Sequence, residues 1–400
     1  MRAKEAMKGA ACVLAVGLVA GAGAGCAGGD DGGAQGVPEV QLGEAEAVWA
    51  EAFAVVSTVR ELPDGRVLVA DPLGQVVVSL DMEAGVADTI GGVGEGPAEY
   101  RQPDAVWPLP GDRTLLVDLG NGRLTVLSPE LEFGDTRPYA VMDPAAGTMA
   151  VAIPQGVDAM GRVYFRGLPG LGEMTDSAKI VRMNPETGDL LTVGMFKQPD
   201  VVREESGGPN NQNVSVTPVP LSPQDAWGVA QDGRVVVVRA GDYHVDWLKA
   251  DGSITSGPPV PYAPVSIGQG EKEEWRDGRS ETGGGMSISV GIANGDMRIT
   301  ASRGGALDDD DALDAYPWPE VKPAFFGQPV PVDRMGRAWV RRHQRAGSAP
   351  RYDLFDGTGV LVMSVELPMN RRVVGFGESA LFAVRMNEFG LQYLERYAVP

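Results

Sequence analysis

Acidic and basic side chains recur at one position of an internal repeat in this chain, about five residues after a turn near the start of each unit. Two consecutive units carry aspartate there, and the next four carry arginine. The planar guanidinium group binds carboxylate, phosphate or sulfate through paired hydrogen bonds. If the units close into a ring, these side chains would surround a mouth that binds a small anion. In chain order the positions are Asp71, Asp118, Arg166, Arg239, Arg342 (or its neighbour Arg341) and Arg385.

The same residues could instead be structural. An aspartate at the end of a strand often caps its own loop, and each arginine could pair with an acid of a neighbouring unit. The case for a ligand site is the charge contrast, because the chain has 34 Lys and Arg against 54 Asp and Glu, a net charge of -20. Arginines gathered at one place would draw anions toward an otherwise negative molecule.

Other catalytic and metal chemistry has less support. His244 and His343 are the only histidines and lie in different units, so a three-histidine zinc site is impossible. No Gly-x-Ser-x-Gly motif occurs, and both cysteines precede the repeats. The acidic run 308–311 is not followed by the glycine of a calcium loop, because Asp314 stands in that place. We expect no metal or cofactor. A divalent cation bound by carboxylates from several units remains as the alternative.

The stretch GGVGEGPAEYRQPDAV, residues 91–106, has the glycine content of a phosphate-binding loop. Such a loop must open a helix, because the helix N-terminus binds the phosphate. Pro97, Pro103 and Pro108 rule out a helix here, and no Gly-Lys-Ser/Thr sequence is present. The stretch is therefore expected to be a connection between two repeats.

The flanks of this stretch match each other over about 47 residues, a spacing typical of propeller blades. Each unit has short β-branched or aromatic strands bounded by Gly, Asp or Pro. Six units predict one closed all-β ring, completed by residues near 45–56 or by the C-terminal strand. The turns that mark the units lie at Arg66, Arg113, Arg162, Arg234, Arg337 and Ser379.

The segment 91–106 resembles the link between blades in NHL-repeat and TolB-like six-bladed β-propellers. Gly96, Pro97, Glu99, Tyr100 and Pro103 match that pattern, whereas the residue at 98 is alanine in place of the usual glycine. The resemblance implies a propeller over 45–400. An insertion at about 263–324, with a helix near its start, would separate blades four and five. Propellers of this kind include lyases, lactonases, sensors and binding modules, so the resemblance implies little about function.

Residues 1–25 have the positive start and small apolar stretch of a signal peptide. The sequence GAGC at 23–26 resembles a bacterial lipoprotein signal, which implies a lipid on Cys26, although Gly23 replaces the usual leucine. The alternative is ordinary cleavage that leaves a free thiol. Residues 26–44 would then be a flexible tether. We expect an exported protein, held to a membrane of the cell envelope through its lipid anchor only.

Two functions remain after these exclusions. The absence of a histidine cluster and of a nucleophile motif favours a non-enzymatic binding module for a small anionic ligand or a protein partner. The alternative is a metal-assisted hydrolase or lyase of the lactonase-like kind. The strong negative charge makes nucleic acid a poor partner. We expect a monomer.

Overall fold

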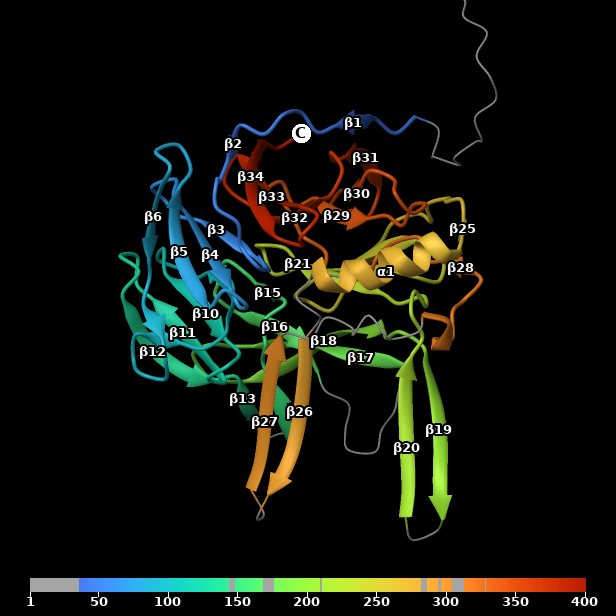
Figure 1. The fold of residues 1–400 in the computed structure, drawn as a ribbon, viewed down its shortest axis with the longest axis horizontal. Coiled ribbons are helices and arrows are strands. Elements are labelled where there is room, and N and C mark those ends of the chain that lie inside the picture. The colour runs from blue at the N-terminus through green and yellow to red at the C-terminus, as the bar shows by residue number, and fades with distance from the viewer. Residues whose placement is uncertain are drawn as a thin grey trace, which may run out of the picture.

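The computed structural model describes residues 36–143, 148–167, 176–208, 211–281, 286–293, 296–303, 313–327 and 329–400. Six four-stranded sheets stand around a common centre (Figure 1). The expected all-β, six-bladed propeller is thereby confirmed.

The first four blades are each formed by consecutive strands, ordered from the centre of the ring outward. Blade one contains β3 (Val59–Glu61), β4 (Val67–Asp71), β5 (Val76–Asp81) and β6 (Val86–Thr89). Blade two contains β9 (Pro103–Pro108), β10 (Thr114–Asp118), β11 (Arg123–Leu127) and β12 (Phe133–Pro138). Blade three contains β15 (Gly156–Val157), β16 (Val163–Arg166), β17 (Ser177–Met183) and β18 (Leu190–Lys197). Blade four contains β21 (Ala226–Val229), β22 (Val235–Arg239), β23 (His244–Leu248) and β24 (Ile254–Ser256).

Blades five and six are completed by strands from the beginning of the chain. This ring closure brings the two ends of the fold together, as the sequence predicted for residues near 45–56. Blade five contains β29 (Ala338–Arg341), β30 (Arg351–Phe355), β31 (Leu361–Glu366) and the parallel strand β1 (Glu39–Gln41). Blade six contains β32 (Arg371–Phe376), β33 (Ala380–Met386), β34 (Gln392–Ala398) and the outer strand β2 (Ala47–Val48).

The start of the propeller differs from the sequence prediction. Residues 26–44 were expected to be a flexible tether, but Glu39–Gln41 pairs with Ser364, Val365 and Glu366 on β31. Leu42 is also buried, in the cluster between blades five and six. A three-residue strand with polar ends carries too weak a pattern to be recognised without its partner. The expected signal region and Cys26 lie outside the described residues.

The strands are short, apolar runs because both faces of every blade are covered by neighbouring blades. Strand β22 has four consecutive buried valines, and all five residues of β4 are buried. One hydrophobic cluster fills each of the six interfaces between adjacent blades. Buried hydroxyl groups add polar links across these interfaces: Tyr243 donates to Asp353 at 2.7 Å, and Tyr352 accepts from the Val373 N–H at 3.2 Å.

The inner edge of blade five is irregular. Residues 325–327 and 329–332 occupy the place of its innermost strand, but the described pairing there consists of two isolated bridges, Phe325 with Arg342 and Val332 with Ala338. Pro329 and Pro331 explain the irregularity, because proline cannot donate a backbone hydrogen bond to a neighbouring strand.

Antiparallel pairing sets which loops share a face. In each blade the innermost strand begins at one face of the ring, and the second and fourth strands end at the same face. All the links between blades therefore lie on one face, which we call the connection face. It carries the pairs β7 (Gly92–Val93) with β8 (Glu99–Tyr100), β13 (Ala140–Asp143) with β14 (Thr148–Val151), and β19 (Val201–Gly208) with β20 (Asn211–Pro218).

The glycine-rich stretch is one of these links. The carboxylate of Glu99 accepts a hydrogen bond from the Gly96 N–H at 2.7 Å, and Arg123 donates to the Gly96 carbonyl at 3.0 Å. Gly94 has φ +159°, a backbone conformation that other residues rarely adopt, and a Cβ there would lie 2.0 Å from the Glu99 carboxylate, so glycine is favoured there. The Glu99 carboxylate therefore stabilises the turn, and the stretch joins blade one to blade two, as expected.

The insertion between blades four and five leaves and returns at one point, where β25 (Val265–Ser266) pairs with β28 (Val321–Lys322). It contains α1 (Gln269–Glu281), the hairpin of β26 (Met286–Ala293) and β27 (Asp296–Arg303), and the 3-10 turn Leu313–Ala315. The N–H of Ala301 in β27 donates to the Tyr139 hydroxyl at 2.9 Å, after blade two. The insertion therefore crosses the connection face.

Candidate functional site

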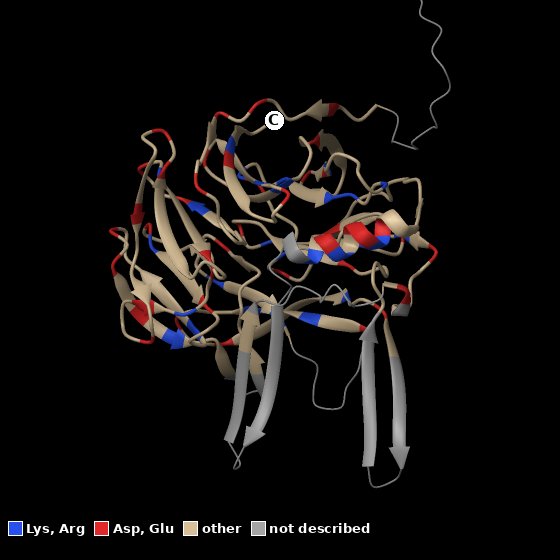
Figure 2. Cartoon of the chain, viewed as in Figure 1, with Lys and Arg blue, Asp and Glu red and all other residues tan. Residues whose placement is uncertain are grey.

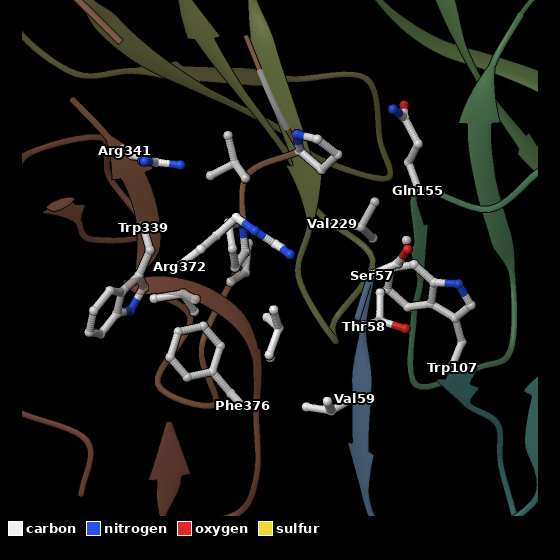
Figure 3. Close-up of a pocket in the computed structure, with 18 of the residues that line it drawn as sticks. Ser57, Thr58, Val59, Trp107, Gln155, Val229, Trp339, Arg341, Arg372 and Phe376 are labelled. Atoms are coloured by element: carbon white, nitrogen blue, oxygen red, sulfur yellow. The ribbon is translucent and has the colours of Figure 1, made fainter. Parts of the chain in front are cut away.

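A cavity of about 580 Å³ lies at the centre of the ring, a size typical of sites for small molecules. We call it the central cavity. All six blades contribute to it, through β3, β9, β15, β21, β32 and residues 326–327 and 329–332. Much of the wall is apolar, with valines and the aromatic side chains of Trp107, Trp339 and Phe376 (Figure 3).

The charges on this wall are all positive among the described residues. Arg334, Arg341 and Arg372 line the central cavity, and no described aspartate or glutamate does. This contrasts with a chain of net charge -20. The cavity therefore offers positive charge inside an acidic molecule, which favours anions over cations.

Arg341 and Arg372 approach the cavity from neighbouring blades, at the end of β29 and near the start of β32 (Figure 3). The Arg341 guanidinium lies over the Phe326 ring, with Cζ 4.4 Å from the ring centroid. Arg372 donates to the Val56 carbonyl at 2.9 Å and lies 3.4 Å from the Gln392 amide oxygen. These contacts hold two guanidinium groups beside one space.

A second cavity, of about 560 Å³, opens under α1 on the connection face. We call it the α1 cavity. Phe326, Gly327, Arg341 and Arg372 line both cavities, so the two spaces meet at the arginine pair. Figure 2 shows α1 as a run of mixed acidic and basic residues across this part of the ring.

His343 lines the α1 cavity and is only 8% exposed. Its Nδ1 lies 3.0 Å from the Pro323 carbonyl, which can only accept, so the proton is on Nδ1. No described residue donates a hydrogen bond to its Nε2. Burial, together with the positive charges of Lys322 and Arg341, lowers the pKa of His343 to about 3. The ring is therefore neutral and presents a lone pair on Nε2.

Acid should destabilise the protein through His343. Its pKa falls from an ordinary 6.5 to about 3 on folding. The unfolded chain alone binds the proton between these values, so this stabilisation is present above pH 6.5 and lost as the pH falls toward 3. The free energy of unfolding should fall by up to about 1.4 kcal/mol per pH unit.

Urea denaturation of the wild type and of His343→Gln at several pH values above the carboxylate range measures this effect. We expect the variant to lose that part of the slope. Identical slopes for the two proteins would show that His343 does not titrate on unfolding.

The structure places the two predicted aspartates in loop caps. Asp71 is 2% exposed and accepts from the N–H groups of Ala54 and Gly74, at 2.6 and 2.8 Å. Asp118 is 1% exposed and accepts from the Gln102 N–H at 3.0 Å and the Asn121 amide at 2.7 Å. Neither lines the central cavity or the α1 cavity.

The predicted arginines do end the second strands, but most contact protein groups there. Arg239 contacts Asp225 at 3.0 Å and Asp246 at 2.7 Å, and Arg385 contacts Glu395 at 3.1 Å. The remaining two are Arg166, which donates to the Gln198 amide oxygen, and Arg342, 3.5 Å from Asp353. Among the six predicted positions, only Arg341, the alternative to Arg342 at the fifth, lines the central cavity or the α1 cavity. A ligand role for the others stays a prediction.

Arg372 was not identified from the sequence. It stands near the start of an inner strand, whereas the series of repeat positions followed the ends of second strands. Its only signal is the pair of arginines at 371–372 before an apolar run. His343 was noted in the sequence only as one of two histidines.

No group of three or more His, Cys, Asp or Glu side chains in the described part of the chain is placed to hold a metal ion. The acidic run 308–311 lies outside the described residues, and Asp314 pairs with Lys272 at 2.9 Å. No described helix combines the length and apolar character needed to cross a bilayer.

Solved structures of other propellers resemble this chain at low sequence identity. A gluconolactonase from Xanthomonas campestris is 10% identical, covers 92% of this chain and 97% of its own, and has a TM-score of 0.41. The calcium-binding protein regucalcin from Agrobacterium tumefaciens is 10% identical, covers 90% and 97%, and has a TM-score of 0.39. A virginiamycin B lyase from Staphylococcus aureus is 10% identical, covers 89% and 99%, and has a TM-score of 0.39.

No family model and no curated protein matches the sequence. The similarities to solved structures concern the propeller fold, so the site must be interpreted from its own residues.

Proposed function

We propose that this protein is a binding module for a small organic anion, which occupies the central cavity with its acid group against Arg341 and Arg372. The observation that carries the proposal is the lining: three arginines and no described carboxylate face the central cavity of a strongly acidic chain. Two guanidinium groups beside one space suit a carboxylate, phosphate or sulfate.

The apolar part of the wall determines what else the ligand carries. Val59, Val106, Val157, Val229 and Phe376 line the same space, so an apolar body would lose contact with water there. The proposed ligand is therefore an amphipathic acid, apolar at one end and charged at the other.

Isothermal titration calorimetry with phenylacetate and hexanoate, each paired with its uncharged amide, tests this proposal. A hydrogen bond to a charged group contributes about 1.5–3 kcal/mol, so Arg341→Gln and Arg372→Gln should each weaken acid binding at least about tenfold. The amides should bind weakly to all variants. Failure of both acids to bind the wild type, or equal binding by the arginine variants, would contradict the proposal.

Arg166→Gln is the matched control. Arg166 occupies the equivalent repeat position in blade three, is exposed, and lines neither cavity. Its replacement removes the same charge and should leave acid binding unchanged. A loss equal to that of the Arg341 variant would instead support the wider arginine arc inferred from the sequence.

We propose that this binding function lies in the cell envelope, because residues 1–25 have a signal pattern and the GAGC sequence predicts a lipid on Cys26. A membrane contact would then be made by the lipid anchor alone. The assignment to the NHL-type group, a protein partner on the ring face, a monomeric state and the metal-assisted alternative stay predictions from the sequence.

A further inference from the structure

The walls of the α1 cavity carry opposite charges. On the side of α1 they include Glu271, Glu273, Glu274 and Asp277, with one cation, Arg279, which lies over the Trp275 ring; on the side of the propeller they include Lys322, Arg341, Arg371 and Arg372. A cavity with an acidic wall and a basic wall suits a ligand that carries both charges.

Several of these groups already serve the protein. Glu271 accepts from the N–H groups of Ala346 and Gly268, both at 3.0 Å, and Glu274 pairs with Lys322 at 2.6 Å. Arg371 makes a two-pronged contact with Glu395. The contacts of Glu271 and Glu274 hold α1 over the cavity, and the contact of Arg371 joins β32 to β34 within blade six.

Two carboxylates of α1 make weaker contacts. Glu273 accepts from the Gln269 amide at 2.9 Å, and Asp277 pairs with its sequence neighbour Arg276 at 3.0 Å. Both contacts involve exposed groups on the same helix, and surface pairs of this kind contribute little. Glu273 and Asp277 can therefore turn toward a cationic ligand at small cost.

His343 is a second, independent observation at the same cavity. It is a buried side chain whose Nε2 receives no hydrogen bond from any described residue. A buried acceptor without a donor is unfavourable, because it has lost its hydrogen bonds to water. A ligand with an N–H group would supply the donor.

The dimensions set the length of the ligand. A sphere of about 560 Å³ is about 10 Å across, and an extended peptide advances about 3.3–3.6 Å per residue. Two or three residues would therefore span from the arginine pair to α1.

We propose that the α1 cavity binds a peptide of two or three residues with free ends. Its carboxylate lies against Arg341 and Arg372, its amino group against Glu273 and Asp277, and a backbone N–H donates to His343. An apolar C-terminal side chain enters the central cavity beyond the arginine pair. This inference rests on the proposed anion site and specifies its ligand.

Glycyl-phenylalanine and N-acetyl-phenylalanine form the decisive pair of probes. They have nearly the same shape, carboxylate and amide N–H, but only the dipeptide has an ammonium group. Calorimetry on the wild type should show the dipeptide binding about tenfold more tightly, which is the effect of one added charged hydrogen bond. Glycyl-phenylalanine amide, which lacks the carboxylate, should bind more weakly than the dipeptide.

The double variant Glu273→Gln, Asp277→Asn should remove the tenfold advantage of the dipeptide and leave N-acetyl-phenylalanine unchanged. The control Glu132→Gln, Asp135→Asn removes the same charge from exposed positions on blade two and should change neither affinity.

The outcomes separate the two proposals. If both probes bind equally and both depend on Arg341, the anion site stands and the peptide inference is wrong. If neither probe binds, both proposals fail. If the α1 variant weakens both probes equally, the carboxylates act through the helix and the peptide inference is again wrong.

Discussion

Replacement of Trp49 by alanine is expected to lower the free energy of unfolding by about 3–5 kcal/mol. Trp49 follows the closing strand β2 and is 7% exposed, within the cluster between blades six and one. The backbone N–H of Trp49 donates to the Leu394 carbonyl at 2.8 Å. Truncation would leave a cavity where the first and last parts of the chain meet, so the ring would lose part of its closing contact.

Urea denaturation, followed by the far-ultraviolet circular dichroism of the backbone, measures the loss of unfolding free energy without relying on tryptophan fluorescence. Val48→Ala is the control, because Val48 directly precedes Trp49 in the chain but is 49% exposed. An exposed substitution of this kind usually changes stability by less than about 0.5 kcal/mol. Equal destabilisation by the two variants would mean that pairing of β2, and not burial of Trp49, holds the ring closed.

Asp118→Ala should destabilise the protein by about 3 kcal/mol or more. The carboxylate accepts from the N–H groups of Arg101, Gln102 and Asn121 and lies 3.5 Å from Arg123. Each buried donor left without an acceptor is unfavourable by about 1–3 kcal/mol. Because Asp118 lines neither cavity, binding of phenylacetate to the folded variant should be unchanged.

Thermal unfolding and calorimetry on Asp118→Ala provide the two measurements, with the exposed Asp135→Ala as control. A variant that keeps its stability but loses anion binding would reverse the interpretation. It would place Asp118 in the mouth of a ligand site, as the repeat pattern first indicated.

The sequence was sufficient to predict the ring, because each blade repeats a turn and two or more β-branched strands. It also located the insertion between blades four and five: the stretch that begins at Gly270 was predicted to start as a helix, and α1 spans Gln269–Glu281. Strand β1 was missed because a three-residue strand is defined by its partner, β31, more than 300 residues away.

The candidate site was only partly predictable. Arg341 stood in the repeat series as an alternative, and neighbouring Arg342 turns toward Asp353. Adjacent residues of a strand point to opposite sides, so the choice depends on the register of β29, which the sequence does not reveal. Arg372 belongs to an inner strand at another repeat position. The two arginines share a cavity only because the ring brings blades five and six together.

Ring closure by the beginning of the chain also has a consequence for biosynthesis. The Val56 N–H donates to the Gln392 side chain, 336 residues later. At about 5–20 residues per second, a ribosome needs roughly 20 to 70 seconds to make that span. Blades one to four can form as they emerge, but strands β1 and β2 stay unpaired until β31 and β34 of blades five and six have been made. During that interval the nascent protein exposes strand edges that can pair with the wrong partner. Molecular chaperones that cover such edges would therefore act on the unfinished ring.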